Sequence, residues 1–141
     1  LFEKKKGDEV LIKNLLAWME KNGVDYTNTF SSLVRKKPYE SGPFQDKTFV
    51  SWYKKWLKRI SRSDKSKELS FNLMQSTNPS VIPRNHKVEE VLNAATIHNN
   101  LTPAQEMIKT LKEPYKNGPG NSGYQKPPKF FDKEYKTFCG T

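Results

Sequence analysis

The feature that most constrains this chain is a stripe of large apolar side chains between residues 49 and 60. Its members are spaced by three, one, three, one and three residues: Phe49, Trp52, Tyr53, Trp56, Leu57 and Ile60. That spacing places them along one side of an α-helix, because about 3.6 residues complete a helical turn. Basic residues fall on the other side: Lys54, Lys55, Lys58, Arg59 and Arg62. The segment therefore predicts an amphipathic helix with an aromatic side for the core and a basic side for solvent or a partner.

Weaker helical periods flank this segment. We expect further helices over residues 8–22, about 27–36, 65–75, 83–98 and 102–113. Gly23 can end the first of them, and Pro38 and Pro79 interrupt the chain between others. No segment alternates in the way typical of a β-strand. The prediction is an all-α fold, a small bundle of five to six helices.

The helices expected after residue 62 have apolar faces of their own. Their periods predict the following buried residues: Leu69, Leu73 and Met74, then Val88, Val91, Leu92 and Ala95, and finally Met107, Ile108 and Leu111. After residue 113 no period is visible, and four prolines and four glycines occur in the last 28 residues. We therefore expect a helical domain over residues 1–113 and an irregular tail over residues 114–141 that carries Cys139.

Composition excludes several classes of protein. Among the 141 residues, 34% are apolar and the net charge is +10, and the mean hydropathy is −0.87. No apolar run approaches the roughly 20 residues that cross a bilayer, so no membrane role is expected. One cysteine cannot form an internal disulfide, and two histidines do not make a structural zinc site. No set of acid, base and nucleophile stands out, so this chain alone does not look like an enzyme.

The basic side of the aromatic helix has three interpretations. It can bind nucleic acid, dock onto an acidic protein surface, or simply face solvent. Base stacking needs aromatic and basic groups on the same exposed surface, whereas here the two kinds lie on opposite sides of the helix. Nucleic acid is therefore the less favoured partner, and a basic nucleic-acid-binding or adaptor module remains the alternative function.

Cys139 stands two residues from the end of the chain. An accessible terminus favours a reactive thiol, and Lys133 and Lys136 can favour the thiolate. An inert cysteine that packs beside Phe138 is an equally good interpretation of the sequence alone.

Several segments, in order along the chain, resemble the selenoprotein O family, the YdiU-like protein adenylyltransferases. The segment Val-Asp-Tyr-Thr-Asn-Thr-Phe at 24–30 is similar to the family, as is Met-Gln-Ser-Thr-Asn-Pro-Ser-Val-Ile-Pro-Arg-Asn-His-Lys-Val-Glu at 74–89. Glu-Pro-Tyr at 113–115, Tyr124 followed by Pro127 and Pro128, and a terminal Phe-Cys-Gly-Thr continue the resemblance.

The resemblance implies a protein-kinase-like enzyme that binds ATP in an inverted orientation and transfers AMP to protein hydroxyls with a divalent metal. ATP and Mg²⁺ are thus expected for the full-length protein, with no cofactor held by this chain. None of the family's catalytic residues can be placed here. The chain also opens at Leu1 without an initiator methionine. We expect a C-terminal helical domain that braces kinase-like lobes lying upstream, with those lobes and the enzyme's protein substrates as partners, in the cytoplasm.

The resemblance also assigns roles to a few residues. Cys139 occupies the place of the family's cysteine or selenocysteine near the C-terminus, which is linked to redox control through a disulfide with a cysteine in the kinase-like part. Arg84, Asn85 and His86 match a family motif, and we interpret them as structural residues that cap the start of a helix.

Overall fold

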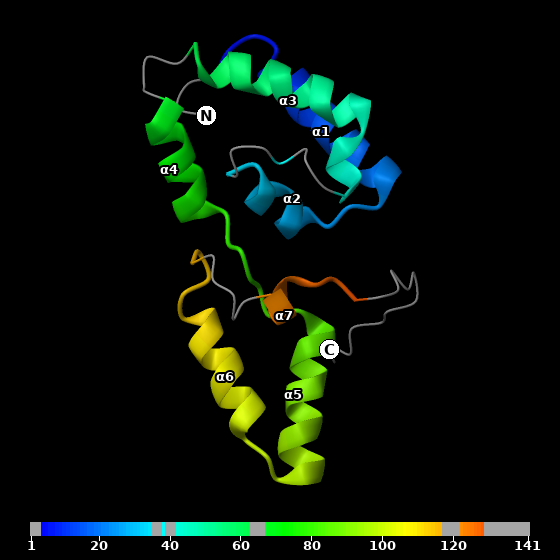
Figure 1. The fold of residues 1–141 in the computed structure, drawn as a ribbon, viewed down its shortest axis with the longest axis vertical. Coiled ribbons are helices and arrows are strands. Elements are labelled where there is room, and N and C mark those ends of the chain that lie inside the picture. Colours follow the sequence, from blue (N-terminus) through cyan, green and yellow to red (C-terminus); the bar gives the residue numbers. More distant parts are fainter. Residues whose placement is uncertain (1–3, 35–37, 39–41, 63–66, 117–121, 129–141) are drawn as a thin grey trace. The chain divides into compact units, whose positions relative to one another are not determined.

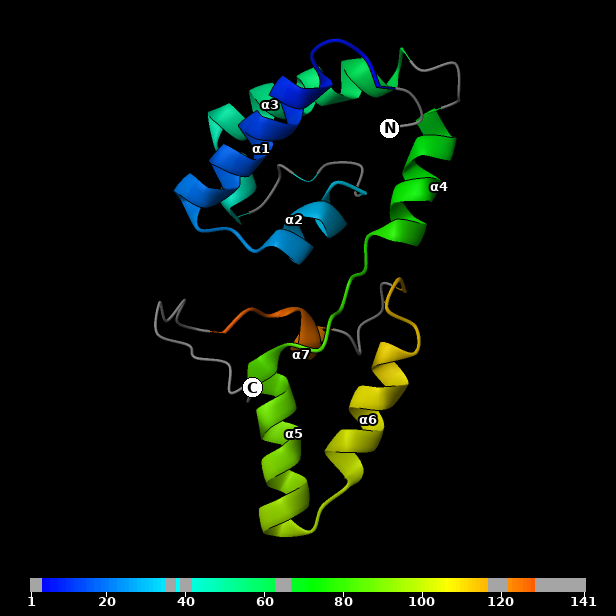
Figure 2. The same ribbon diagram turned by 180° about the vertical axis from the view of Figure 1, so that it is seen from behind.

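The computed structural model describes residues 4–34, 38, 42–62, 67–116 and 122–128. Helices dominate these ranges, and none of the residues within them forms a strand, so the predicted all-α class is confirmed. The chain divides into two compact units, residues 1–79 and 80–141. Figures 1 and 2 show the two units from opposite sides.

The first unit contains α1 (Asp8–Asn22), α2 (Tyr26–Ser32), the 3-10 turn η2 (Gly42–Gln45), α3 (Lys47–Ile60) and α4 (Lys67–Thr77). Helices α1 and α3 lie side by side in both views (Figures 1 and 2). They run antiparallel, since the start of α1 bonds to the end of α3 and the end of α1 bonds to the residue before α3. This helix pair is the frame of the unit.

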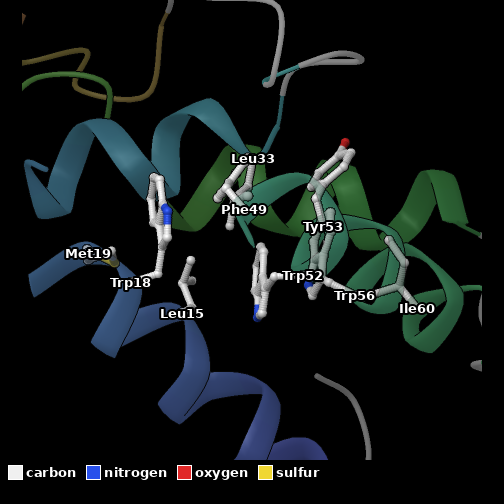
Figure 3. Close-up of a cluster of buried hydrophobic side chains, with 9 residues drawn as sticks. All are labelled: Leu15, Trp18, Met19, Leu33, Phe49, Trp52, Tyr53, Trp56 and Ile60. Carbon is white, nitrogen blue, oxygen red and sulfur yellow. The ribbon is translucent and has the colours of Figure 1, made fainter. Parts of the chain in front are cut away.

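The core of the first unit lies between α1, α2 and α3 (Figure 3). Its buried members are Leu15, Trp18, Met19, Leu33, Phe49, Trp52, Tyr53, Trp56 and Ile60. Phe49 has no exposed surface, and its ring centroid lies 4.6 Å from that of Trp18 and 5.0 Å from that of Phe44. The predicted aromatic stripe is confirmed, since five of its six residues are buried in this core. Large rings allow a short, strongly charged chain to bury enough apolar area to fold.

Local chemistry sets several helix ends. Gly23 follows α1 with a φ of 57°, a left-handed conformation that glycine adopts without strain. Asp25 accepts a hydrogen bond from the backbone N–H of Asn28 at 2.8 Å, so α2 starts at Tyr26. Helix α2 ends at Ser32, earlier than the sequence predicted, and Leu33 still enters the core.

The predicted inner face of α4 is partly wrong. Leu69 and Leu73 are exposed, whereas Ser70 is buried and Phe71 and Met74 pack against the core. The ring of Phe71 meets that of Trp56 edge to face, with centroids 6.0 Å apart and planes at 87°. This contact turns the helix so that its leucines face outward.

The second unit consists of α5 (Asn85–His98), α6 (Thr102–Leu111) and the short α7 (Ser122–Gln125). Helices α5 and α6 contact each other, and α7 lies in the segment for which the sequence predicted no regular structure. The extended residues before α5 are the best buried. The backbone N–H of Ser80 donates to the carbonyl oxygen of Pro114 at 2.7 Å, and Val81 is almost fully buried.

The predicted inner faces of α5 and α6 are also partly wrong. Met107 is buried as expected, but α5 contains no fully buried residue. Leu92 is 55% exposed and Ile108 is 56% exposed. When two helices such as α5 and α6 pack together, each buries only the apolar side chains on the face toward the other. Their remaining apolar side chains stay in contact with solvent.

A candidate interaction groove between two helices

One end of the α1–α3 pair is held by Asp8 and Arg59. The Arg59 Nε donates to Asp8 Oδ1 at 2.6 Å, and Nη2 donates to Oδ2 at 2.8 Å. The Arg59 side chain is only 15% exposed and that of Asp8 only 4%. The backbone N–H of Lys5 also donates to Asp8 Oδ2 at 2.9 Å. The Arg59 hydrogen bonds hold the pKa of Asp8 below its ordinary value of 3.8, against the effect of burial.

The other end is held by Asp46, which precedes α3. Its Oδ2 accepts from Trp18 Nε1 at 2.7 Å and from the Phe49 backbone N–H at 3.2 Å. Desolvation acts to raise the pKa of this carboxyl, but the hydrogen bonds from Trp18, Phe49 and Thr48 together outweigh it, so the pKa lies below 3.8. Asp46 thus caps α3 and fixes α1 against it.

Between these ends, Trp52 joins the two helices. Its Nε1 donates to the carbonyl oxygen of Leu11 at 2.8 Å. The indole N–H groups of Trp18 and Trp52 therefore both donate hydrogen bonds across the helix pair. These bonds satisfy the polar N–H group of each buried indole.

A groove of about 450 Å³ runs along the surface of this pair. Both helices and the cap of α3 line it, through Asn14, Ala17, Trp18, Lys21, Asn22, Asp46, Thr48, Ser51, Trp52 and Lys55. Trp18 is only 4% exposed and Trp52 only 7%, so the two indoles offer little surface to the groove. The rim is polar and contains one exposed lysine from each helix, Lys21 and Lys55.

Four of the five basic residues predicted to share one exposed side are exposed, and the fifth, Arg59, is not. Lys54, Lys55, Lys58 and Arg62 are exposed, and Lys55 lines the groove. Arg59 does not belong to the exposed basic face, because its guanidinium turns back to Asp8. Lys21 was not singled out from the sequence, since only the pairing of α1 with α3 brings it near Lys55.

The other candidate residues lie away from the groove. Arg84 is buried and precedes α5, but its side chain makes no capping hydrogen bond to that helix. Its backbone carbonyl accepts from the N–H groups of Lys87 and Val88 at 2.9 and 3.0 Å. Asn85 is exposed and His86 half-buried at the start of α5. The expected side-chain cap is thus absent at Arg84. Cys139 lies outside the described residues.

The described ranges lack two further features. Within them, no group of three or more His, Cys, Asp or Glu residues is placed to hold a metal ion. None of the helices described there has the length and apolar character needed to span a bilayer.

Comparison with known proteins places this chain in a family of protein adenylyltransferases. Residues 2–112 match the family model described as protein adenylyltransferase SelO. The chain therefore belongs to the SelO family, as its resemblance predicted.

Individual relatives agree with this assignment. Over all 141 residues, the chain is 40% identical to the protein nucleotidyltransferase YdiU of Bacillus cereus (strain ZK / E33L) and to that of Bacillus anthracis (strain A0248). It is 39% identical to that of Bacillus cereus (strain G9842). The chain spans 29% of the length of these relatives, and the matched part is their C-terminal part.

Proposed function

We infer that this chain serves as the C-terminal helical region of a SelO-like protein adenylyltransferase and supports the catalytic part of that enzyme. The observation that carries the inference is the match of the whole chain to 29% of the nucleotidyltransferase relatives. The remaining length of such an enzyme would bind ATP and Mg²⁺ and transfer AMP to hydroxyl groups of protein substrates, in the cytoplasm.

The second unit supports a bracing role. Leu92, Ile97, Leu101 and Ile108 each expose more than half of their surface, and α5 contains no fully buried residue. A helix gains most of its stability from packing an apolar stripe. Contact with the catalytic part would cover such side chains and stabilise both partners.

Cys139 would give this region a second role. The Cys139 thiol and a cysteine thiol of the catalytic part would form a disulfide when an oxidant such as hydrogen peroxide takes up their two electrons and two protons, and this bond would tie the end of the chain to that part. Redox control of AMP transfer is therefore part of the proposal. In the chain by itself, Cys139 has no second cysteine to pair with.

The proposal is tested by transplanting the chain. The C-terminal part of the Bacillus cereus relative is replaced by this chain, and AMP transfer from ATP to a protein substrate is measured by mass spectrometry in the presence of Mg²⁺. We expect transfer by the chimera, little by the relative truncated before this part, and none by the 141-residue chain alone. Transfer by the chain alone, or equal transfer with and without it, would contradict the proposal.

A further inference from the structure

We propose that the groove between α1 and α3 binds an extended, acidic segment of polypeptide. This proposal does not depend on the enzymatic role above, because it rests on the charge and shape of the first unit.

Charge is the first argument. Lys21 and Lys55 lie on the rim of the groove, one from each helix, and neither makes an ion pair with any described residue. The groove contains one acid, Asp46, whose carboxylate already accepts hydrogen bonds from Trp18 and Phe49. Residues 1–79 hold 16 basic and 9 acidic side chains, a net charge of +7. A ligand with carboxylates therefore complements this surface.

The arrangement of basic groups along α3 is the second argument. Lys47, Lys55 and Lys58 are exposed and follow one another at steps of eight and three residues, which keeps them near one side of the helix. This basic row continues past the groove toward the end of α3, where Lys58 follows Lys55. A segment that lies along the helix would thus meet several cations, whereas a single small anion would meet only one or two.

Polar side chains of the groove suit a peptide backbone. Asn14 and Ser51 are exposed on facing helices, and Thr48 lies at the start of α3. An amide and two hydroxyls can donate to peptide carbonyls and accept from peptide N–H groups. Lysines would hold the acidic side chains while these groups fix the backbone.

Burial of the indoles argues against single-stranded nucleic acid. Stacking of a base needs an open aromatic face, and Trp18 and Trp52, although they line the groove, are only 4% and 7% exposed. The cations remain available, but the stacking platforms do not. An acidic peptide is therefore the occupant that uses what this surface offers.

The test uses the 141-residue chain and a fluorescein-labelled peptide of alternating glutamate and serine. Binding is followed by fluorescence anisotropy at low and at near-physiological salt. We expect saturable binding that weakens with salt, and a loss of about tenfold in affinity for the variant Lys21→Glu/Lys55→Glu. The matched control is Lys109→Glu/Lys112→Glu, which makes the same charge change on exposed lysines at the end of α6 and should alter affinity by less than about twofold.

Three results would overturn the proposal: no saturable binding at low salt, equal losses for both double variants, or tighter binding of an oligothymidylate that depends on the same two lysines. Far-UV circular dichroism checks that each variant is folded. If the charge-reversal pair does not fold, Lys21→Gln/Lys55→Gln gives the same test, with an expected loss of about threefold.

Discussion

Asp8 and Arg59 are separated by 51 residues in the sequence and form a bidentate ion pair that joins the start of α1 to the end of α3. At the opposite end of the same helix pair, Asp46 accepts a hydrogen bond from Trp18. Each carboxylate therefore holds α1 and α3 together at one end of the antiparallel pair, and aromatic side chains pack between these two ends. The groove depends on this arrangement, since it fixes the distance and rotation of the helices that line it.

Removal of the Asp8 charge should destabilise the first unit. Asp8→Asn leaves the largely buried Arg59 guanidinium without its counter-ion, which costs roughly 2–4 kcal/mol in the free energy of unfolding. Urea denaturation followed by tryptophan fluorescence measures this change. Glu9→Gln is the matched control, because Glu9 is exposed and its ion-pair partner among the described residues is Lys4, and a change below about 0.5 kcal/mol is expected. Equal losses for both variants would show that the ion pair contributes little.

Acid should weaken the first unit through the same carboxyls. The pKa values of Asp8 and Asp46 lie below 3.8 in the folded protein, so the folded state binds these protons less readily than the unfolded state. Their contribution to stability is complete above that ordinary value and is lost as the pH falls from it through the folded pKa values. Urea midpoints measured from neutral pH down to about pH 3 should fall most steeply below about pH 4.

The variant Asp8→Asn separates the two carboxyls in that experiment. It removes one of the two titrating groups, so its urea midpoint should be lower at neutral pH but should fall less on acidification than that of the native chain. Parallel pH profiles for the two proteins would show that Asp8 does not have the lowered pKa inferred from its contacts.

The aromatic centre should be the most sensitive part of the core. Phe49→Ala removes a ring without exposed surface that packs on Trp18, Phe44, Trp52 and Tyr53. A loss of about 3–5 kcal/mol is expected from lost burial and the remaining cavity. Leu73→Ala, at an exposed position of α4, should cost less than about 1 kcal/mol. Urea denaturation compares the two, and a larger effect at Leu73 would contradict the described core.

Sequence reasoning succeeded where one element carried its own complete pattern. The six apolar residues of α3 repeat regularly enough to define a buried side without knowledge of any partner, and five of them are buried in the structure. Arg59 could not be distinguished in this way. Its sequence neighbour Lys58 is exposed, and only the register of α3 against α1 brings Arg59 to Asp8.

The errors in α4 and α5 have a related cause. Leu69 and Leu73 have the right spacing for a buried stripe, but so do Phe71 and Met74 on a neighbouring side of the helix. The position of Trp56 decides between these two sides. In α5, Leu92 belongs to an apolar side that is wider than α6 alone can cover.

The groove could not be predicted from the sequence either. Its two lysines come from different helices, and only the packing of α1 against α3 brings them to one site.

Substitutions at the exposed apolar residues of the second unit test the proposed bracing role directly. Leu92→Gln/Ile108→Gln should change the stability of the 141-residue chain by less than about 0.5 kcal/mol, because both side chains are largely in solvent there. In the chimera with the Bacillus cereus catalytic part, contact would bury these positions. The same pair should then lower the free energy of unfolding by about 2–4 kcal/mol, seen as a drop in Tm and in AMP transfer. Glu89→Gln/Glu106→Gln, at exposed polar positions of the same helices, is the control. If the apolar pair leaves the chimera unchanged while transplantation itself restores activity, these two side chains do not form the contact and bracing must use another surface.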